Sequence, residues 1–156
     1  MSDFSAKKRV GIIGGNVPDA QSLKNAERLG ELIAQNGYIL VNGGMRGVME
    51  ASARGAKSAD GLVIGILPGK SQDECNAYVD IAIPTGLGYM RNPMVILNSD
   101  IIIAIDGSYG TLSEIAYARI YNRTVFGLNT WNIEGVIPLA TPEEVIRRIN
   151  RYFNHQ

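Results

Sequence analysis

The sequence predicts a single doubly wound, Rossmann-like α/β domain with a mainly parallel sheet and helices on both faces. Two observations support this fold class. Short runs rich in Ile and Val alternate with longer segments whose apolar residues recur at helical spacing. In addition, residues 101–105 (IIIAI) are apolar at every position, which is typical of a strand covered on both faces. Because no linker, repeat or low-complexity segment interrupts the alternation, we expect one domain over residues 1–156.

The expected elements alternate between strand and helix along the chain. In order, they are a strand at 10–13, a helix at 22–36, a strand at 38–41, a helix at 48–60, strands at 62–67 and 81–83, a helix at 92–99, a strand at 101–105, a helix at 111–122, strands at 124–128 and 136–139, and a helix at 141–153. The strands are short and rich in Ile, Val and Leu, whereas the helices are amphipathic or, at 48–60, rich in alanine. Residues 70–80 are expected to form a loop.

Residues with strong positional preferences mark several helix ends. Gly37 follows the first helix, where a left-handed glycine commonly ends a helix. Asn92 and Pro93 suit the N-cap and the first helical position. Thr141 and Glu144 form a capping box with a proline at the first helical position, so we expect the last helix to begin there.

Charge balance and residue counts argue against several classes of protein. Lys plus Arg number 15 and Asp plus Glu number 15, so the formal net charge is +0. A neutral domain has no overall field to hold a polyanion, and we therefore expect no nucleic-acid partner. His155 is the only histidine and Cys75 the only cysteine, which argues against a His-based triad, a disulfide or a metal site.

Apolar runs are all too short to place the chain in a membrane. None approaches the roughly 18 residues that span a bilayer. The apolar run that follows Arg9 ends at Gly14, which is short for the core of a signal peptide. We therefore expect a cytoplasmic protein without a membrane partner.

Glycines are the one compositional excess, and they gather where strands end. The chain has 18 glycines among 156 residues, above an average of roughly 7%. Gly14-Gly15-Asn16, Gly43-Gly44 and residues 107–110 follow three separate expected strands. Each turn alone is compatible with an ordinary short loop between strand and helix. Three turns on the carboxyl edge of one parallel sheet favour a phosphate-bearing ligand, because exposed N–H groups and helix N-termini bind anions there.

Two familiar phosphate motifs are missing from these turns. No G-x-G-x-x-G pattern follows the first strand, and no G-x-x-x-x-G-K-[ST] pattern occurs in the chain. The sequence therefore carries neither the standard dinucleotide-binding fingerprint nor the Walker-A motif of nucleotide hydrolases.

The segment 106–114 (DGSYGTLSE) allows two interpretations of Glu114. Thr111 can cap the following helix, and Glu114 lies three residues later, so the pair fits a capping box in which the carboxylate accepts from the Thr111 N–H. Alternatively, Glu114 points into the crevice, where it binds a ribose or stabilises positive charge at a sugar carbon. The spacing alone favours the cap.

The order of these pieces resembles the LOG-like (SLOG) superfamily. The resemblance rests on residues 43–47 (GGMRG), Arg91, residues 99–100 (SD) and residues 107–114 (GSYGTLSE), and it covers nearly the whole chain. It is strongest to the branch of small proteins similar to molybdenum cofactor carriers. Relatives have been labelled lysine decarboxylases, but no lysine lies in a recognisable pyridoxal-phosphate context, so we expect no such activity.

The resemblance implies roles for particular residues. LOG enzymes are phosphoribohydrolases that release the base from N6-modified adenosine monophosphates, and their catalytic Arg and Glu fall on Arg91 and Glu114. The family's Lys position is Asn92, and its Pro-Gly-Gly is Asp106-Gly107-Ser108. These two departures make the site more negative by about two charges, which weakens the case for hydrolysis more than the case for binding.

We therefore expect a binding protein for a phosphorylated small molecule, either a nucleotide or a pterin such as the molybdenum cofactor. No cofactor is required for this function. A LOG-like phosphoribohydrolase that uses Arg91 and Glu114 is the alternative, and a scaffold for a partner protein with a vestigial pocket is a third. The expected ligand contacts are Gly14, Gly15, Asn16, Gly43, Gly44, Arg91, Asn92, Gly107, Ser108, Tyr109, Gly110, Thr111 and Glu114. Tyr89 and Tyr109 could flank a planar ligand or pack at the rim, and the resemblance implies a homo-oligomer, dimer or tetramer.

Overall fold

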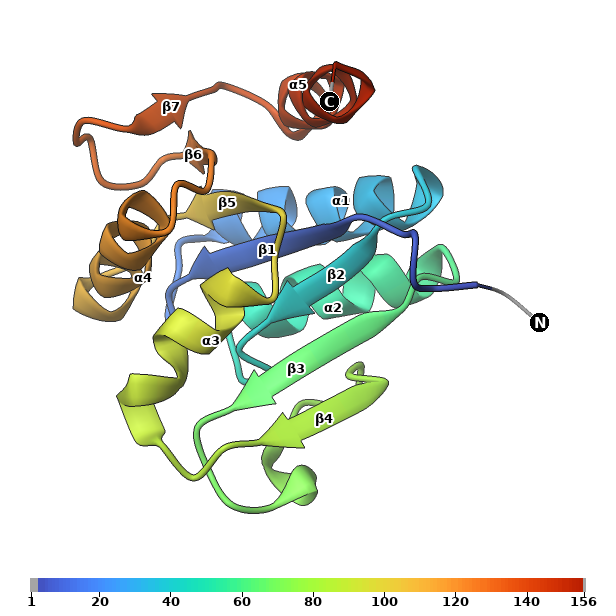
Figure 1. Cartoon of the computed structure of the whole chain (residues 1–156), viewed down its shortest axis with the longest axis vertical. Coiled ribbons are helices and arrows are strands. Elements are labelled where there is room, and N and C mark those ends of the chain that lie inside the picture. Colours follow the sequence, from blue (N-terminus) through green and yellow to red (C-terminus); the bar gives the residue numbers. More distant parts are fainter. Residues whose placement is uncertain (1–2, 156) are drawn as a thin grey trace.

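Seven strands form one sheet within residues 3–155, the part of the chain that this computed structural model describes. They are β1 (Arg9–Gly14), β2 (Ile39–Asn42), β3 (Val63–Leu67), β4 (Ile81–Pro84), β5 (Ile101–Ile105), β6 (Val125–Leu128) and β7 (Val136–Pro138). Their order is β4-β3-β2-β1-β5-β6-β7, and every neighbouring pair is parallel (Figure 1). Residues 1, 2 and 156 of the expected domain lie outside the described residues, and the single-domain organisation stays a prediction.

Helices cover both faces of the sheet, as the sequence predicts. They are α1 (Ala20–Gln35), α2 (Val48–Ser58), α3 (Asn92–Leu97), α4 (Tyr109–Ile120) and α5 (Pro142–Asn154), with short 3-10 helices η1 (Gln72–Glu74) and η2 (Gly88–Arg91). Helices α1, α2 and α5 share one apolar core with the sheet, and α3 and α4 share a second core on the opposite face (Figure 1). The doubly wound α/β prediction is therefore confirmed.

Strand β5 shows why the fold class was readable from the sequence. Ile101, Ile103 and Ile105 belong to the first core, and Ile102 and Ala104 belong to the second. All five side chains are buried, since successive residues of a strand point to opposite faces. A strand covered on both sides needs an apolar residue at every position.

The two halves of the chain meet between β1 and β5. From β1 the chain builds β2, β3 and β4 outward on one side, and then returns so that β5 pairs with the other side of β1. Loops that leave the carboxyl ends of β1 and β5 turn in opposite directions at this point. Such a topological switch opens a crevice beside the sheet, which is where ligands bind in open α/β folds.

Three helix starts differ from the sequence prediction. Helix α1 begins at Ala20, two residues early, because the Asp19 carboxylate accepts from the Ser22 N–H at 2.7 Å. Asn92 is not an N-cap, because η2 runs directly into α3 and gives Asn92 a helical backbone. Ser108 is the N-cap residue of α4, so Thr111 lies inside the first turn rather than before it.

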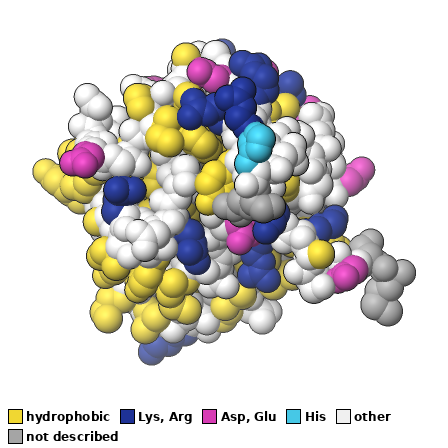
Figure 2. Space-filling view, turned by 45° about the horizontal axis from the view of Figure 1, so that its top comes forward, with side chains coloured by type: hydrophobic (Ala, Val, Ile, Leu, Met, Phe, Trp, Pro, Cys, Tyr) yellow, Lys and Arg dark blue, Asp and Glu magenta, His cyan; other side chains and the backbone are white. Residues whose placement is uncertain are grey.

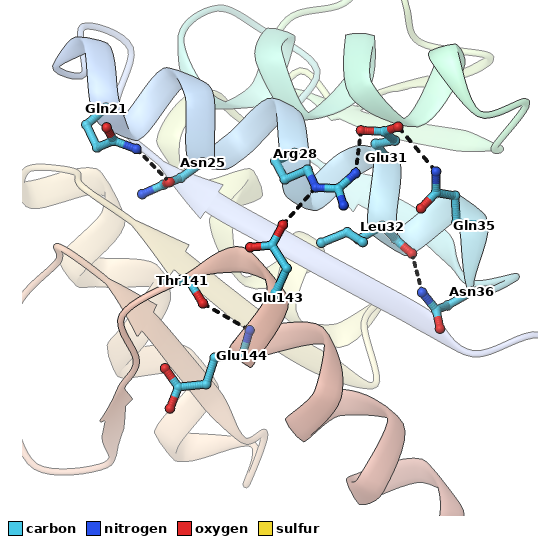
Figure 3. A network of polar contacts seen from close by, with 10 residues as sticks. All are labelled: Gln21, Asn25, Arg28, Glu31, Leu32, Gln35, Asn36, Thr141, Glu143 and Glu144. Carbon is cyan, nitrogen blue, oxygen red and sulfur yellow. Dashed lines mark hydrogen bonds and ion pairs between the residues drawn. The ribbon is translucent and has the colours of Figure 1, made fainter.

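The last helix starts as its capping box predicts. The Thr141 hydroxyl accepts from the Glu144 N–H at 3.2 Å, and the Glu144 carboxylate accepts from the Ala140 N–H at 3.0 Å. Figure 3 shows this cap beside α1, where Arg28 donates to Glu143 at 2.9 Å. Both side chains of that pair are well exposed, so it orients α5 more than it stabilises the fold.

The surface carries no single sign of charge on the face shown in Figure 2. Lys and Arg side chains gather beside His155, with apolar and acidic side chains between and around them. Apolar side chains collect along the lower left, the side on which α3 and α4 lie in Figure 1. Among the helices of residues 3–155, none combines the length and apolar character needed to cross a membrane.

Candidate ligand-binding site

A cavity of about 630 Å³ opens at the carboxyl edge of the sheet, beside the crossover from β1 to β5. Its walls come from the ends of β1 and β2, the first turns of α2 and α4, and the junction of η2 with α3. This volume lies in the range of small-molecule binding sites. The position agrees with the strand-end site that the glycine turns predict.

Most of the residues expected to contact a ligand line this cavity. They are Gly14, Gly15, Asn16, Gly43, Arg91, Asn92, Ser108, Gly110, Thr111 and Glu114. Three expected contacts, Gly44, Gly107 and Tyr109, do not line it. The structure thus brings together residues from three distant turns, while their contact with a ligand stays a prediction.

The three exceptions have structural roles. Gly107 has φ +106°, and a Cβ there would overlap the Thr111 side chain, so this glycine lets the loop close over the first turn of α4. Gly44 packs in the same way against Leu67. The Tyr109 ring turns outward and lies 6.0 Å from the Trp131 ring, centroid to centroid.

Sequence reasoning missed an apolar wall and one cation. The additional lining residues are Ile12, Ile13, Val17, Met45, Arg46, Met49, Pro68 and Gly88, together with Tyr89, which was expected only as a possible flank. Met45 and Arg46 belong to the glycine turn at 43–47, so their position beside that turn was a signal that could have found them. Val17 and Met49 could not be assigned, since either could equally have been surface or core residues.

Arg91 is built into the wall of the cavity. Its side chain is 8% exposed, and Nε donates to the Ile66 carbonyl at 3.0 Å while Nη2 donates to the Gly43 carbonyl at 3.4 Å. A Cβ at position 43 would lie 2.5 Å from Nη2, so only glycine admits the guanidinium here. Burial lowers the pKa of Arg91 and the charge of Glu114 opposes that shift, but a guanidinium stays protonated in proteins.

Asn92 connects Arg91 to the start of α4. Its Oδ1 accepts from Arg91 Nη1, and its Nδ2 donates to Ser113 Oγ at 3.1 Å and to the Gly110 carbonyl at 3.5 Å. A lysine, as at this position in LOG enzymes, has no acceptor for the guanidinium. The departure from the family pattern therefore replaces a second cation with a bridge that orients the first.

Glu114 is not a helix cap. It lies in the interior of α4, is 8% exposed, lines the cavity and makes no side-chain hydrogen bond to any residue from 3 to 155. Burial raises its pKa to about 8, against the opposing effect of Arg91. The capping-box interpretation is wrong because the helix starts at Tyr109, which places Thr111 and Glu114 within the helix rather than at its start.

Asp106 contributes less negative charge to the cavity than the sequence suggests. It does not line the cavity. Its carboxylate accepts from the Gly107 N–H at 2.8 Å and from the Asp19 N–H at 3.2 Å, and its backbone adopts φ +52°. The side chain therefore holds the loop in shape from behind. The expected penalty of two charges against an anion is accordingly an overestimate.

Two helices begin at the cavity without a side-chain cap. Gly47 precedes α2 and Ser108 precedes α4, and neither makes a side-chain hydrogen bond to its helix. By contrast, α1 and α5 are capped by Asp19 and Thr141. The Val48 N–H of α2 donates to the Gly15 carbonyl at 3.1 Å. The other N–H groups of these first turns and the positive ends of the two helix dipoles attract anions.

Comparison with known proteins identifies the family. The model of the SLOG cluster4 family matches residues 7–150. The chain belongs to the SLOG cluster4 family. The chain is also 47% identical over 139 residues to an uncharacterized protein of Archaeoglobus fulgidus, covering 88% of this chain and 91% of the relative.

Two solved structures show the same fold as this SLOG cluster4 member. The molybdenum cofactor binding protein of the phototrophic bacterium Rippkaea orientalis is 39% identical, with a TM-score of 0.90 over 96% of this chain and 99% of that one. The molybdenum cofactor carrier protein of Chlamydomonas reinhardtii is 32% identical, with a TM-score of 0.84 over 93% and 97%. The expected resemblance to the LOG-like superfamily and its carrier branch is confirmed.

Proposed function

We propose that this protein binds a phosphorylated small molecule with a planar ring system, of the molybdenum cofactor or nucleotide type. The observation that carries the proposal is the convergence of two uncapped helix N-termini on a cavity that also holds Arg91. The names of the similar structures, a molybdenum cofactor binding protein and a molybdenum cofactor carrier protein, support a pterin-type ligand.

The cavity divides into a polar part and an apolar part that suit such a ligand. The phosphate would lie between the first turns of α2 and α4 and the part of the wall that holds Arg91 and Glu114. A planar ring would lie against the side chains of Met45, Met49 and Tyr89, which supply polarizable and aromatic surface. Bound molybdenum cofactor would bring its own redox chemistry, and the protein's part would be to hold and shield it.

One substitution separates anion binding from helix stability. Asp at position 108 would cap α4 and stabilise it by about 0.5–1 kcal/mol, but it would also place a carboxylate where the phosphate is proposed to lie. We expect Ser108→Asp to raise the melting temperature while weakening the binding of AMP and of a phosphorylated pterin at least tenfold by calorimetry.

The matched control is Ser71→Asp, which makes the same change at the N-cap of η1, away from the cavity. It should leave affinity for both probes unchanged. Native mass spectrometry of freshly purified protein gives the complementary test, because a co-purifying phosphorylated compound would identify the ligand. If no nucleotide, sugar phosphate or pterin binds to the wild-type protein, the proposed function is wrong.

A second candidate function, LOG-like hydrolysis of a nucleoside 5′-monophosphate, is favoured by the presence of Glu114 and Arg91 in one cavity. An ionised Glu114 would stabilise the oxocarbenium-like transition state. Because the pKa of Glu114 is raised to about 8, such an activity should increase as the pH rises from 7 to 9. Release of adenine from AMP, compared with a Glu114→Gln variant, tests this function; equal background rates in both proteins would exclude it.

A further inference from the structure

We propose that Glu114 acts as a neutral carboxylic acid that donates a hydrogen bond to an oxyanion of the ligand, so that anion binding is coupled to the proton on Glu114. The inference rests on the proposed function and adds to it the group that senses the charge of the ligand. Neither the glycine turns nor the helix N-termini require this coupling.

The geometry gives Glu114 no partner in the protein. The residue is only 8% exposed, yet it lines the cavity and makes no side-chain hydrogen bond within the described part of the chain. The carboxyl oxygens face the cavity and are open to a ligand that fills it. We therefore expect the carboxyl group to form its hydrogen bond with the ligand rather than with the protein.

The charges around Glu114 decide which protonation state an anion selects. Among described residues, the ionisable side chains that line the cavity are Arg46, Tyr89, Arg91 and Glu114. The elements packed against α4, namely α3, β1 and β5, add no other ionisable group at the cavity. Asp106, at the start of the loop before α4, has its carboxylate bonded to backbone N–H groups outside the cavity.

The protonation state of Glu114 sets the net charge of the part of the cavity wall formed by Arg91 and Glu114. When Glu114 is ionised, it neutralises Arg91 and repels an incoming phosphate. When Glu114 is neutral, the Arg91 charge is free to attract the phosphate, and the carboxyl O–H supplies a donor. The Arg91 guanidinium donates hydrogen bonds to Ile66, Gly43 and Asn92, so its position is the same in both protonation states of Glu114.

The coupling fixes the proton balance of binding. Where Glu114 is already neutral, the anion binds without exchange of a proton. Where Glu114 is ionised, binding takes up one proton from solvent, which ends on the Glu114 carboxyl group. With a pKa of about 8 in the free protein, the first case applies at pH 7 and the second at pH 9.

The test measures the affinity for AMP and for a phosphorylated pterin at pH 7 and pH 9. The phosphate group of such probes has a second pKa of about 6, so its charge changes little over this range. For the wild-type protein we expect the dissociation constant to rise roughly tenfold from pH 7 to pH 9, with uptake of about one proton at pH 9. For Glu114→Gln, which keeps a neutral donor at both values, we expect a ratio close to one.

Glu134→Gln is the matched control, since Glu134 is exposed and lies outside the cavity. It should keep the tenfold ratio of the wild type. The ligand-free protein offers an independent readout: with Glu side chains labelled with ¹³C at the carboxyl carbon, one resonance should titrate near pH 8 and vanish in Glu114→Gln.

The outcomes separate the two proposals. Binding with equal affinity at pH 7 and pH 9, or a tenfold ratio that persists in Glu114→Gln, overturns the coupling and leaves the proposed function standing. A Glu114 resonance that is already ionised at pH 7 also overturns the coupling. Failure of both probes to bind at pH 7 overturns the proposed function, and the coupling with it.

Discussion

Glu114 makes the stability of the folded protein depend on pH even without a ligand. Its carboxyl group has an ordinary pKa of 4.5 when exposed and a pKa of about 8 in the fold. Between these values the folded state holds a proton that the unfolded state has released. The free energy of unfolding therefore falls as the pH rises from about 4.5 to about 8, and this contribution is constant above that range.

Glu114→Gln should abolish this pH-dependent fall in the free energy of unfolding. Relative to the wild type, we expect little change in the free energy of unfolding at pH 4 and a gain of a few kcal/mol at pH 9. Urea unfolding at both values measures the difference, with Glu134→Gln as a control that shows no pH-dependent gain. A gain that is the same at pH 4 and pH 9 would mean that Glu114 is not the titrating group.

Asn92 permits a test of the bridge between Arg91 and α4. Asn92→Lys removes the acceptor for Arg91 Nη1, leaves the Ser113 hydroxyl without this donor and places two like charges side by side. We expect a loss of about 1–3 kcal/mol in the free energy of unfolding. Asn132→Lys, on an exposed loop, should change it by less than about 0.5 kcal/mol. An unchanged stability in Asn92→Lys would show that the bridge does not hold the site together.

At the scale of elements, the contact between α1 and α2 depends on two glycines. A Cβ at Gly30 would overlap the Ser52 carbonyl oxygen, and a Cβ at Gly55 would overlap the Glu27 carbonyl oxygen. The two helix backbones therefore approach closely where they cover the same face of the sheet. Helix α2 also reaches the cavity, through Met49 in its first turn.

Gly55→Ala should destabilise the fold although alanine is the better helix former. Overpacking costs about 1–3 kcal/mol, which exceeds the gain of roughly 1 kcal/mol in helix propensity. Gly110→Ala is the matched control, because a Cβ there meets only the Tyr89 ring at 3.9 Å. Thermal unfolding should show a lower melting temperature for the first variant and an equal or higher one for the second; the reverse order would refute the close approach of the helices.

The strands and helices could be predicted because their signals are local. Residues 101–105 are apolar throughout, and Thr141 with Glu144 marks a helix start within four residues. The start of α4 was predicted too late because Thr111, followed by Glu114, matches the capping-box pattern. In the structure the N-cap residue is Ser108, whose side chain makes no capping hydrogen bond, so no local signal marks it. The packing role of Gly30 and Gly55 could not be predicted either, because the backbone atoms that approach each of them belong to another helix.

The candidate site was predicted where its residues lie in turns and missed where they lie in elements. Gly15 and Gly43 follow strands whose carboxyl ends share an edge, so their proximity follows from the topology. Met49, on α2, enters the cavity only through the orientation of that helix. The carboxylate of Asp106 could not be assigned either, because its partner, the Asp19 N–H, is 87 residues away.

At the scale of the whole molecule, several exposed apolar side chains belong to the segment from Leu87 to Leu97 and to α4. From the residue before η2 through α3 these side chains follow at helical spacing, and α4 adds a further one: Leu87, Met90, Met94, Leu97 and Ile120. Exposed apolar side chains that gather on one side of a protein commonly mark an interface. The homo-oligomer, the cytoplasmic location and the lack of a nucleic-acid partner all stay predictions.

We expect the protein to assemble through this surface. Size-exclusion chromatography with light scattering should give a dimer or tetramer for the wild type and a monomer for the double variant Met94→Glu/Leu97→Glu. Lys24→Glu, which introduces a carboxylate at an exposed position of α1, should leave the assembly intact. A wild-type protein of 16.9 kDa in solution would contradict the expectation.

The pairing of β1 with β5 has a consequence for when the site comes into existence. The residues paired across these strands, such as Val10 with Ile101, are about ninety positions apart, and contacts of such long range form late because the intervening chain must first be ordered. Helix α2 belongs to the part of the chain made before β5, and α4 to the part made after it. A chain emerging from the ribosome therefore has no cavity until β5 has joined the sheet. A ligand held between the two helices would be retained only by chains that have finished folding, so its capture would report on the completed molecule.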